Sequence, residues 1–204
     1  MAGQLFDTTA EFRRIPNLFE IISFDYWEKN YGYVMNDQIA AHKEDYLEDP
    51  AGREHVLDIV QTKLKMSGLS REEIDSISSG RKLKMADNFF AGGHELIIGK
   101  RHYIEGATED NAKASSGSMS PEMHYQYMNF TIAALKDIYL NNRYVRYVTV
   151  FQNWLNQAGA SFDHLHKQLV AIDCISASNE NEFQLARENP NIYNDFAVNY
   201  AGYQ

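Results

Sequence analysis

Cysteine is almost missing from this sequence: Cys174 is the only one among 204 residues, so no disulfide can form within the chain. Its neighbours in "VAIDCIS" predict a buried strand, and a single buried thiol favours a reducing compartment. Long apolar runs are missing as well. No stretch approaches the length of a membrane span, and "MAGQLFDTTAEFRR" lacks the apolar core of a signal peptide. We therefore expect a cytoplasmic protein with no membrane partner.

Positively charged residues are also few. The chain has 19 lysines and arginines against 28 aspartates and glutamates, which gives a formal net charge of -9. A nucleic-acid groove needs a basic surface to neutralise phosphates, so nucleic acid is excluded as the main partner, although a small anion site is not. With 44% hydrophobic and 23% charged residues, the composition is that of an ordinary globular protein.

Helix signals are clearest near residue 60. Asp49 is a suitable N-cap, Pro50 suits the first helical position, and Gly68 provides a stop after a run of apolar residues at helical spacing. Ser70 and Glu73 then form a capping box, which predicts a second, short helix.

A longer helix is expected after residue 120, where a serine precedes a proline. Its predicted apolar face consists of Met123, Tyr127, Phe130, Ala134 and Ile138. The segments "RRIPNLFEIISF", "HELIIGKRHYI", "NRYVRYVTVFQN" and "HKQLVAIDCIS" read as strands. Connections after residue 140 are too short for repeated helical crossovers. We therefore predict an α+β fold, an antiparallel sheet with packed helices, in a single domain over residues 1–204.

The segment "NQAGASFDHLHKQ" carries the strongest chemical signal. On a strand, His164, His166 and Gln168 would share one face, with Leu165 and Lys167 on the other. A neutral imidazole can attack phosphorus, and a glutamine amide can hold a phosphate oxygen. The small residues before the pair would let backbone N–H groups approach a phosphate. From spacing alone, a nucleophile, a metal-ligand pair and a solvated face stay equally open.

A second candidate begins the strand in "GGHELII". The glycines beside His94 would allow a ligand to approach the backbone, which is one interpretation of this segment. The other is that the glycines form a turn and the histidine bonds a local carbonyl.

The stretch "FQNWLNQAGASFDHLHKQLVA" resembles the active-site segment of the galactose-1-phosphate uridylyltransferase family, a branch of the histidine-triad superfamily. That family shows Phe-x-Asn, a Gly-x-Ser turn, and then His-Pro-His-x-Gln. The matching residues here are Phe151, Asn153, Gly159, Ser161, His164, His166 and Gln168. Upstream, "FRRIPNLFEI" resembles the family's Arg-x-x-Pro-Asn strand, and "GGHELIIGKRH" resembles its Gly-x-His-Glu strand. The resemblance covers about residues 10 to 200.

The resemblance implies a histidine-triad-like fold and a role for each matching residue. His166 would be the nucleophile that forms a covalent nucleotidyl-histidine, and Gln168 would hold a phosphate oxygen. The nucleotide would be contacted by Asn153, Gly159, Ser161 and His164. A structural zinc, where family members have one, would be bound by His102 and His164; no organic cofactor is implied.

The sequence departs from the family in three ways. Leu165 replaces a proline, the cysteine pair that completes the zinc site is missing, and only the first half of the family's length is matched. The expected substrates are a nucleotide-sugar and a sugar 1-phosphate. Alternatives are a dinucleoside polyphosphate or ADP-sugar phosphorylase of the same superfamily, and a nucleotide-binding module without turnover. The oligomeric state stays open, including a homodimer.

Overall fold

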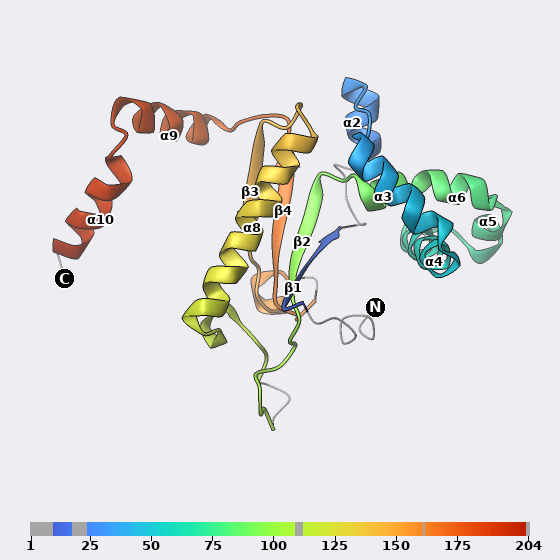
Figure 1. Cartoon of the computed structure of the whole chain (residues 1–204), viewed down its shortest axis with the longest axis horizontal. Coiled ribbons are helices and arrows are strands. Elements are labelled where there is room, and N and C mark those ends of the chain that lie inside the picture. The colour runs from blue at the N-terminus through green and yellow to red at the C-terminus, as the bar shows by residue number, and fades with distance from the viewer. Residues whose placement is uncertain (1–9, 18–23, 109–111, 161, 203–204) are drawn as a thin grey trace.

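A four-stranded antiparallel sheet forms the centre of the protein (Figure 1). The structure is a computed structural model that describes residues 10–17, 24–108, 112–160 and 162–202. In sequence order the strands are β1 (Phe12–Pro16), β2 (His94–Gly99), β3 (Tyr147–Phe151) and β4 (His166–Ile172). Their order in the sheet is β1-β2-β4-β3, so β4 is hydrogen-bonded on both sides. This arrangement confirms the predicted α+β fold and its antiparallel sheet.

Helix α8 (Pro121–Asn141) lies across one face of the sheet, which we call the helix face (Figure 1). Its start is the predicted one, because the side chain of Ser120 accepts a hydrogen bond from Met123 N. Tyr127 is fully buried and stacks on Phe12 of β1, with ring centroids 4.8 Å apart. The main core lies beneath this helix and includes Ile97, Tyr127, Ala134, Ile138, Leu169 and Ala171.

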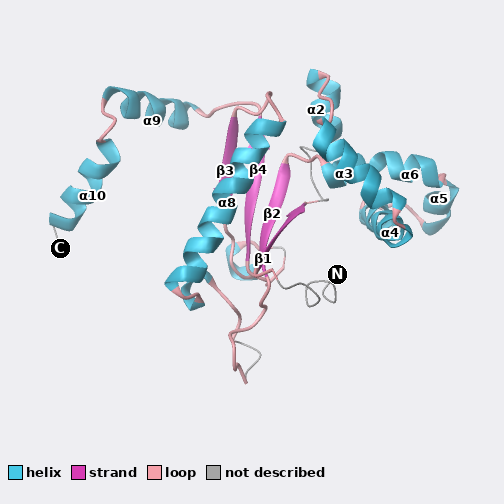
Figure 2. Cartoon of the chain, in the orientation of Figure 1, coloured by secondary structure: helices cyan, strands magenta, loops and turns pink. Residues whose placement is uncertain are grey.

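A group of helices lies beyond the β1 edge of the sheet (Figure 2). It consists of α2 (Phe24–Tyr31), α3 (Asp37–Glu48), α4 (Pro50–Met66), α5 (Arg71–Ser76), α6 (Ser79–Met85) and α7 (Asp87–Phe90). A second core, around Val56, Val60 and Leu64 of α4, holds α3 to α7 together, whereas Phe24 and Trp27 of α2 belong to the main core. The predicted caps of α4 and α5 are confirmed, since Asp49 accepts from Ala51 N and Ser70 forms its capping box.

The last two helices extend away from the sheet on the side opposite that group (Figure 1). They are α9 (Ala177–Glu188) and α10 (Ile192–Gly202), and neither contains a buried residue. Two short 3-10 helices, η1 (Ser116–Ser118) and η2 (Asn156–Ala158), lie in loops. Among the described residues, no helix has both the length and the apolar character that crossing a membrane requires.

The prediction of a buried strand around Cys174 was wrong. Strand β4 ends at Ile172, two residues earlier, and the thiol is exposed. Asp173 breaks the strand pattern because its carboxylate accepts hydrogen bonds from the hydroxyl groups of Tyr26 and Tyr31 on α2. The chain therefore turns outward just where the apolar residues "CI" suggested that the strand continued.

An ionic cluster joins β1, β2 and α8 on the helix face. Arg14 donates two hydrogen bonds to the carboxylate of Glu95 and a third, 2.8 Å long, to Asp137. The side chains of Arg14 and Glu95 are only 26% and 14% exposed. Burial raises the pKa of Glu95, while Arg14 opposes that shift by favouring the carboxylate. The ion pair therefore compensates a buried charge, so that losing one partner costs more than the pair contributes.

We predict that Arg14→Met lowers the free energy of unfolding by about 3 kcal/mol at pH 7, because it leaves Glu95 charged and buried. Without Arg14, the pKa of Glu95 in the folded state should lie above the unfolded value of about 4.3. Proton uptake then favours the folded state as the pH falls, so the loss should be smaller at pH 5 than at pH 7. Urea unfolding at both pH values measures this.

The matched control is Asp137→Asn, which removes the other acceptor of Arg14. That carboxylate is 55% exposed, so the change should cost less than about 1 kcal/mol. An Arg14→Met protein as stable at pH 7 as the unsubstituted chain would contradict the assignment of Arg14 as the compensating charge.

Candidate functional site

Strand β4 places His166 and Gln168 on the face of the sheet opposite α8, which we call the histidine face. In β4, Leu169 and Ala171 point into the core below α8, so the alternate residues point the other way. His166 pairs with Ile98 of β2, and Gln168 pairs with Leu96 of β2 and Phe151 of β3. The predicted alternation is therefore confirmed for His166, Lys167 and Gln168, whereas His164 lies in a bend before the strand begins. Lys167 points to the helix face, where its ammonium lies 4.8 Å from the centroid of the Tyr127 ring.

The imidazole of His166 is fixed by its own backbone and by an aromatic neighbour. Nδ1–H donates to the carbonyl of His164 at 2.7 Å, so Nε2 carries the lone pair. The ring of Phe162 stacks on the imidazole, with centroids 4.1 Å apart and an angle of 19°. His166 is 1% exposed, and in the described part of the chain nothing hydrogen-bonds its Nε2. An unsatisfied buried acceptor costs about 1–3 kcal/mol, which a bound group can relieve.

Burial also determines the charge of His166. It lowers the pKa of His166 below that of an ordinary histidine, and His164 lowers it further through charge repulsion. The hydrogen bond to the backbone acts in the opposite direction but is the smaller effect. His166 is therefore neutral at pH 7, the state in which Nε2 can act as a nucleophile.

A row of neutral polar groups continues from Gln168 across the histidine face. His94, the first residue of β2, has its Nε2 2.9 Å from Oε1 of Gln168. The amide Nδ2 of Asn17 lies 3.4 Å from Nδ1 and 3.3 Å from Nε2 of His94. The N–H of Asn17 also donates to the carbonyl of His94 at 2.9 Å. Strands β2 and β4 and the residue that follows β1 therefore contribute one side chain each to a continuous row.

His102 and His164, the candidate zinc ligands, lie side by side. Their Nδ1 atoms are 3.2 Å apart, although 62 positions separate them in the chain. Because Nε2–H of His164 donates to the carbonyl of Gly99, its Nδ1 is the acceptor in the pair. Burial and the neighbouring His164 both lower the pKa of His102. Next to the pair, Lys113 forms an ion pair with Asp163.

The loop between β3 and β4 places Asn153 near Gly159. A methyl group added to Gly159 would lie 3.8 Å from Nδ2 of Asn153. Gly159 has φ +82°, where other residues are strained. Strand β3 ends at Phe151, opposite Gln168 and two residues before Asn153. Asn153 and Gly159 are thus brought together, whereas Ser161 lies outside the described residues.

One expectation about this loop was wrong. The small residues were expected to present backbone N–H groups to a phosphate. Instead, the N–H groups of Ala158 and Ala160 donate to the carbonyl of Leu155, and that of Gly159 donates to Asn156. These three donors are used inside the loop, so side-chain donors have to contact a ligand in this conformation.

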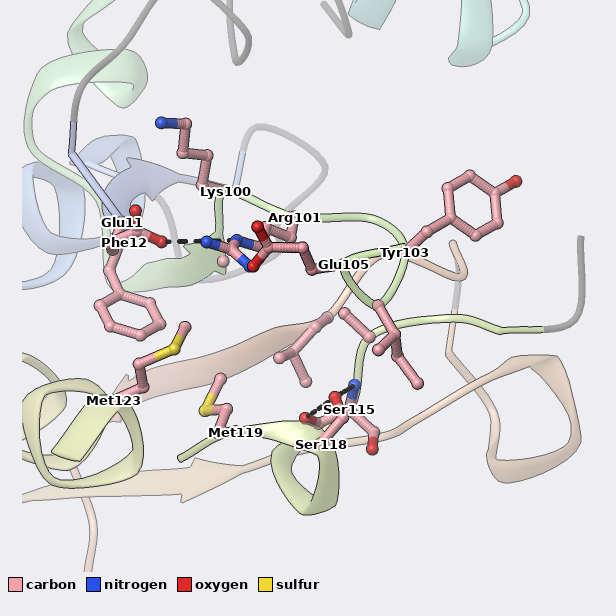
Figure 3. A pocket seen from close by; sticks show the side chains of 14 residues that line it. Glu11, Phe12, Lys100, Arg101, Tyr103, Glu105, Ser115, Ser118, Met119 and Met123 are labelled. Atoms are coloured by element: carbon pink, nitrogen blue, oxygen red, sulfur yellow. Dashed lines mark hydrogen bonds and ion pairs between the residues drawn. The ribbon is translucent and has the colours of Figure 1, made fainter. Parts of the chain in front are cut away.

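A cavity of about 230 Å³ lies close to the histidines but on the helix face (Figure 3). Phe12, Met119, Met123 and Leu165 form its apolar wall. At its rim, Arg101 lies between the carboxylates of Glu11 and Glu105 (Figure 3). Neither His166 nor Gln168 lines this cavity, so the cavity does not form part of the candidate site.

Two residues of the candidate site, Phe162 and Asn17, were not predicted from the sequence. A third, His94, had two interpretations. The signals were present, because His94 starts a strand after two glycines, and Asn17 follows the proline that ends β1. What the sequence does not contain is the pairing of β1 with β2 and of β2 with β4, which brings these residues to Gln168.

Comparison with known proteins gives a family without an assigned role. The family described as "Domain of unknown function (DUF4921)" matches residues 1–204. No curated protein and no solved structure matches the chain. The resemblance to the uridylyltransferase family therefore rests on the motif residues alone. Because the match extends over the whole sequence, the chain belongs to the DUF4921 family.

Proposed function

We propose that this protein transfers a nucleoside monophosphate between phosphate-bearing molecules through a covalent nucleotidyl-histidine at His166. The observation that carries the proposal is the state of the His166 imidazole. It is neutral, its Nδ1–H is held by the His164 carbonyl, and its Nε2 lone pair has no hydrogen-bond partner within the described ranges. The resemblance of "HLHKQ" to a uridylyltransferase motif supports the same assignment.

In the first step, Nε2 of His166 attacks the α-phosphorus of a nucleotide-sugar. A phosphorus–nitrogen bond forms, and the bond from phosphorus to the bridging oxygen breaks. The sugar 1-phosphate leaves with that electron pair. In the second step, a phosphate oxygen of another sugar 1-phosphate attacks the same phosphorus, and His166 takes back its electron pair. No proton is gained or lost over the two steps.

The contacts of His166 suit the charge of this intermediate. An imidazole bonded to phosphorus at Nε2 is positively charged, with its remaining proton on Nδ1. That proton already donates to the His164 carbonyl at 2.7 Å, so the hydrogen bond strengthens as the charge develops. The backbone acceptor needs no reorientation during the reaction, which is the property expected of a preorganised catalytic contact.

Gln168 is two residues further along the same face, where its amide can hold an oxygen of the transferred phosphate. Glutamine neither carries a charge nor delivers a proton to a leaving group. It therefore favours an intermediate that waits for a phosphate acceptor over one that is hydrolysed at once. Arg13 of β1 pairs with Ile98, the partner of His166, so it lies on the same face and is the candidate contact for the leaving phosphate.

We predict that His166→Ala abolishes formation of the covalent adduct. The protein is incubated with UDP-glucose, ADP-glucose and diadenosine polyphosphates, and intact mass spectrometry detects an added uridylyl or adenylyl group. His164→Ala should weaken labelling without abolishing it, because it removes the hydrogen bond to Gly99 that positions the turn before His166.

The control is His124→Ala, which changes an exposed histidine of α8 and should leave labelling unchanged. An adduct that still forms in His166→Ala would show that another residue is the nucleophile. The compound that labels the protein distinguishes a hexose-1-phosphate uridylyltransferase from a phosphorylase acting on adenine nucleotides. A protein that binds these compounds without being labelled by any of them would be a binding module.

We predict that Gln168→Ala lowers kcat about a hundredfold, the usual cost of losing one oxyanion donor. The rise in KM should be smaller than this loss of kcat. The amide of Gln168 would hold the phosphate most strongly when charge is redistributed in the transition state, so the loss falls on kcat. Steady-state kinetics with the best substrate of the panel measures both constants. Gln184→Ala on α9, an exposed change, is the control. A raised KM with an unchanged kcat would reduce Gln168 to a ground-state contact.

The zinc implied by the family resemblance fits these residues only in part. Two nitrogens on one tetrahedral zinc lie about 3.3 Å apart, given bonds of about 2.0–2.1 Å, and the Nδ1 atoms of His102 and His164 are 3.2 Å apart. However, no third histidine, cysteine, aspartate or glutamate joins them within the part of the chain that the structure describes. A structural site normally has four protein ligands. No step of the proposed reaction depends on a metal.

We therefore predict that purified protein dialysed against a chelator retains well below one equivalent of zinc and still forms the His166 adduct. Two ligands hold zinc too weakly to survive dialysis, while the hydrogen bonds of His166 do not involve a metal. Elemental analysis together with intact mass measures both. One tightly held equivalent that is lost in His102→Ala would mean that two further ligands exist.

A further inference from the structure

We infer that His94 is a positioning residue for Gln168: it fixes the amide so that its NH2 group, and not its oxygen, faces the transferred phosphate. This inference rests on the proposed function and adds a residue to it. The carrying observation is the 2.9 Å contact between Nε2 of His94 and Oε1 of Gln168.

The orientation of the Gln168 amide decides whether this side chain attracts or repels the transferred phosphate. Its Oε1 accepts hydrogen bonds, and its Nε2 carries two donors. A phosphate oxygen is bound by the NH2 end and repelled by the oxygen end. Rotating the amide by half a turn exchanges the two ends at little steric cost, so packing alone does not select between them. A neighbour that donates a hydrogen bond to Oε1 does select, because it stabilises only one of the two orientations.

His94 is placed to be that neighbour by the register of the sheet. It pairs with Val170, two residues beyond Gln168 in β4, so both side chains point to the histidine face. The imidazole is partly buried, and burial lowers the pKa of His94, while the contact with Gln168 opposes that shift. A hydrogen bond sheltered from water holds a side chain more firmly than an exposed one.

Donation to Gln168 requires the proton of neutral His94 to be on Nε2. The contact with Oε1 of Gln168 favours this tautomer, because an amide oxygen accepts and does not donate. Asn17 packs against the same imidazole, with its Nδ2 3.4 Å from Nδ1 and 3.3 Å from Nε2 of His94, so it does not select between the two tautomers. The proposed donors therefore run from His94 to Gln168 and from there to the substrate phosphate.

The first test measures the tautomer directly and needs no substrate. Long-range proton–nitrogen NMR spectra of the full chain, labelled with nitrogen-15, separate Nε2–H from Nδ1–H imidazoles. His94→Gln identifies the His94 signals by their loss. We expect Nε2–H at neutral pH. An Nδ1–H tautomer would make His94 an acceptor, would turn the Gln168 oxygen toward the phosphate, and would overturn the inference.

The second test compares variants that remove and restore the donor. His94→Phe keeps an aromatic ring without a donor and should lower kcat about tenfold with little change in KM, the scale expected for an orienting partner. His94→Gln has an amide that can donate to Gln168 Oε1 and should restore kcat to within about threefold of the unsubstituted protein. A purely structural role would not give this rescue, since glutamine fills the ring's space poorly. His124→Phe is the matched control.

The outcomes separate this inference from the proposed function. A protein that no compound of the panel labels refutes the proposed function, and the tautomer measurement still decides the orientation of Gln168. If the unsubstituted protein is labelled but His94→Phe has the same kcat, the inference fails and the transferase proposal stands. If His94→Phe fails to fold, as judged by circular dichroism, the inference is tested by the His94 tautomer and by the kcat of His94→Gln.

Discussion

The position of β4 between two strands is the constraint on which the rest of this structure depends. Hydrogen bonds to β2 and to β3 fix its register from both sides. A shift by one residue would turn Leu169 out of the core and put Gln168 under α8. The same apolar contacts that bury the core below α8 therefore keep His166 and Gln168 on the opposite face. Stability and the geometry of the site come from one set of contacts.

The same burial that keeps His166 neutral also closes its Nε2 to solvent. His166 is 1% exposed, and burial is also what keeps it neutral. In the proposed reaction, a substrate would reach Nε2 only if some of the surrounding groups moved, and Phe162 stacks on the imidazole from a loop, not from the sheet. Loop residues can move without breaking the β4 ladder, so the proposed nucleophile would stay fixed.

Local signals explain which parts of the structure could be predicted from the sequence. Caps at Asp49, Ser70 and Ser120 act within four residues, and the alternation from His166 to Gln168 needs only one strand, so these were confirmed. Helices α2 and α3 were missed because α2 is only eight residues long and buries only Phe24 and Trp27, while α3 buries none of its residues. The contact of His102 with His164 was expected only from a family resemblance, because it depends on strand pairing over a long separation.

The polar row on the histidine face suits a phosphate despite the chain's net charge of -9. Asn17, His94 and Gln168 are neutral donors, and they contact one another on a partly buried face where hydrogen bonds are stronger than in water. In the proposed reaction, a buried lysine next to His166 would repel the positively charged intermediate, whereas neutral donors would bind the phosphate without that repulsion. The positive charge of Arg13 lies two strands away, where it would contact the leaving phosphate instead of the transferred one. Such a separation would stabilise the departing group without disturbing the proposed nucleotidyl-histidine.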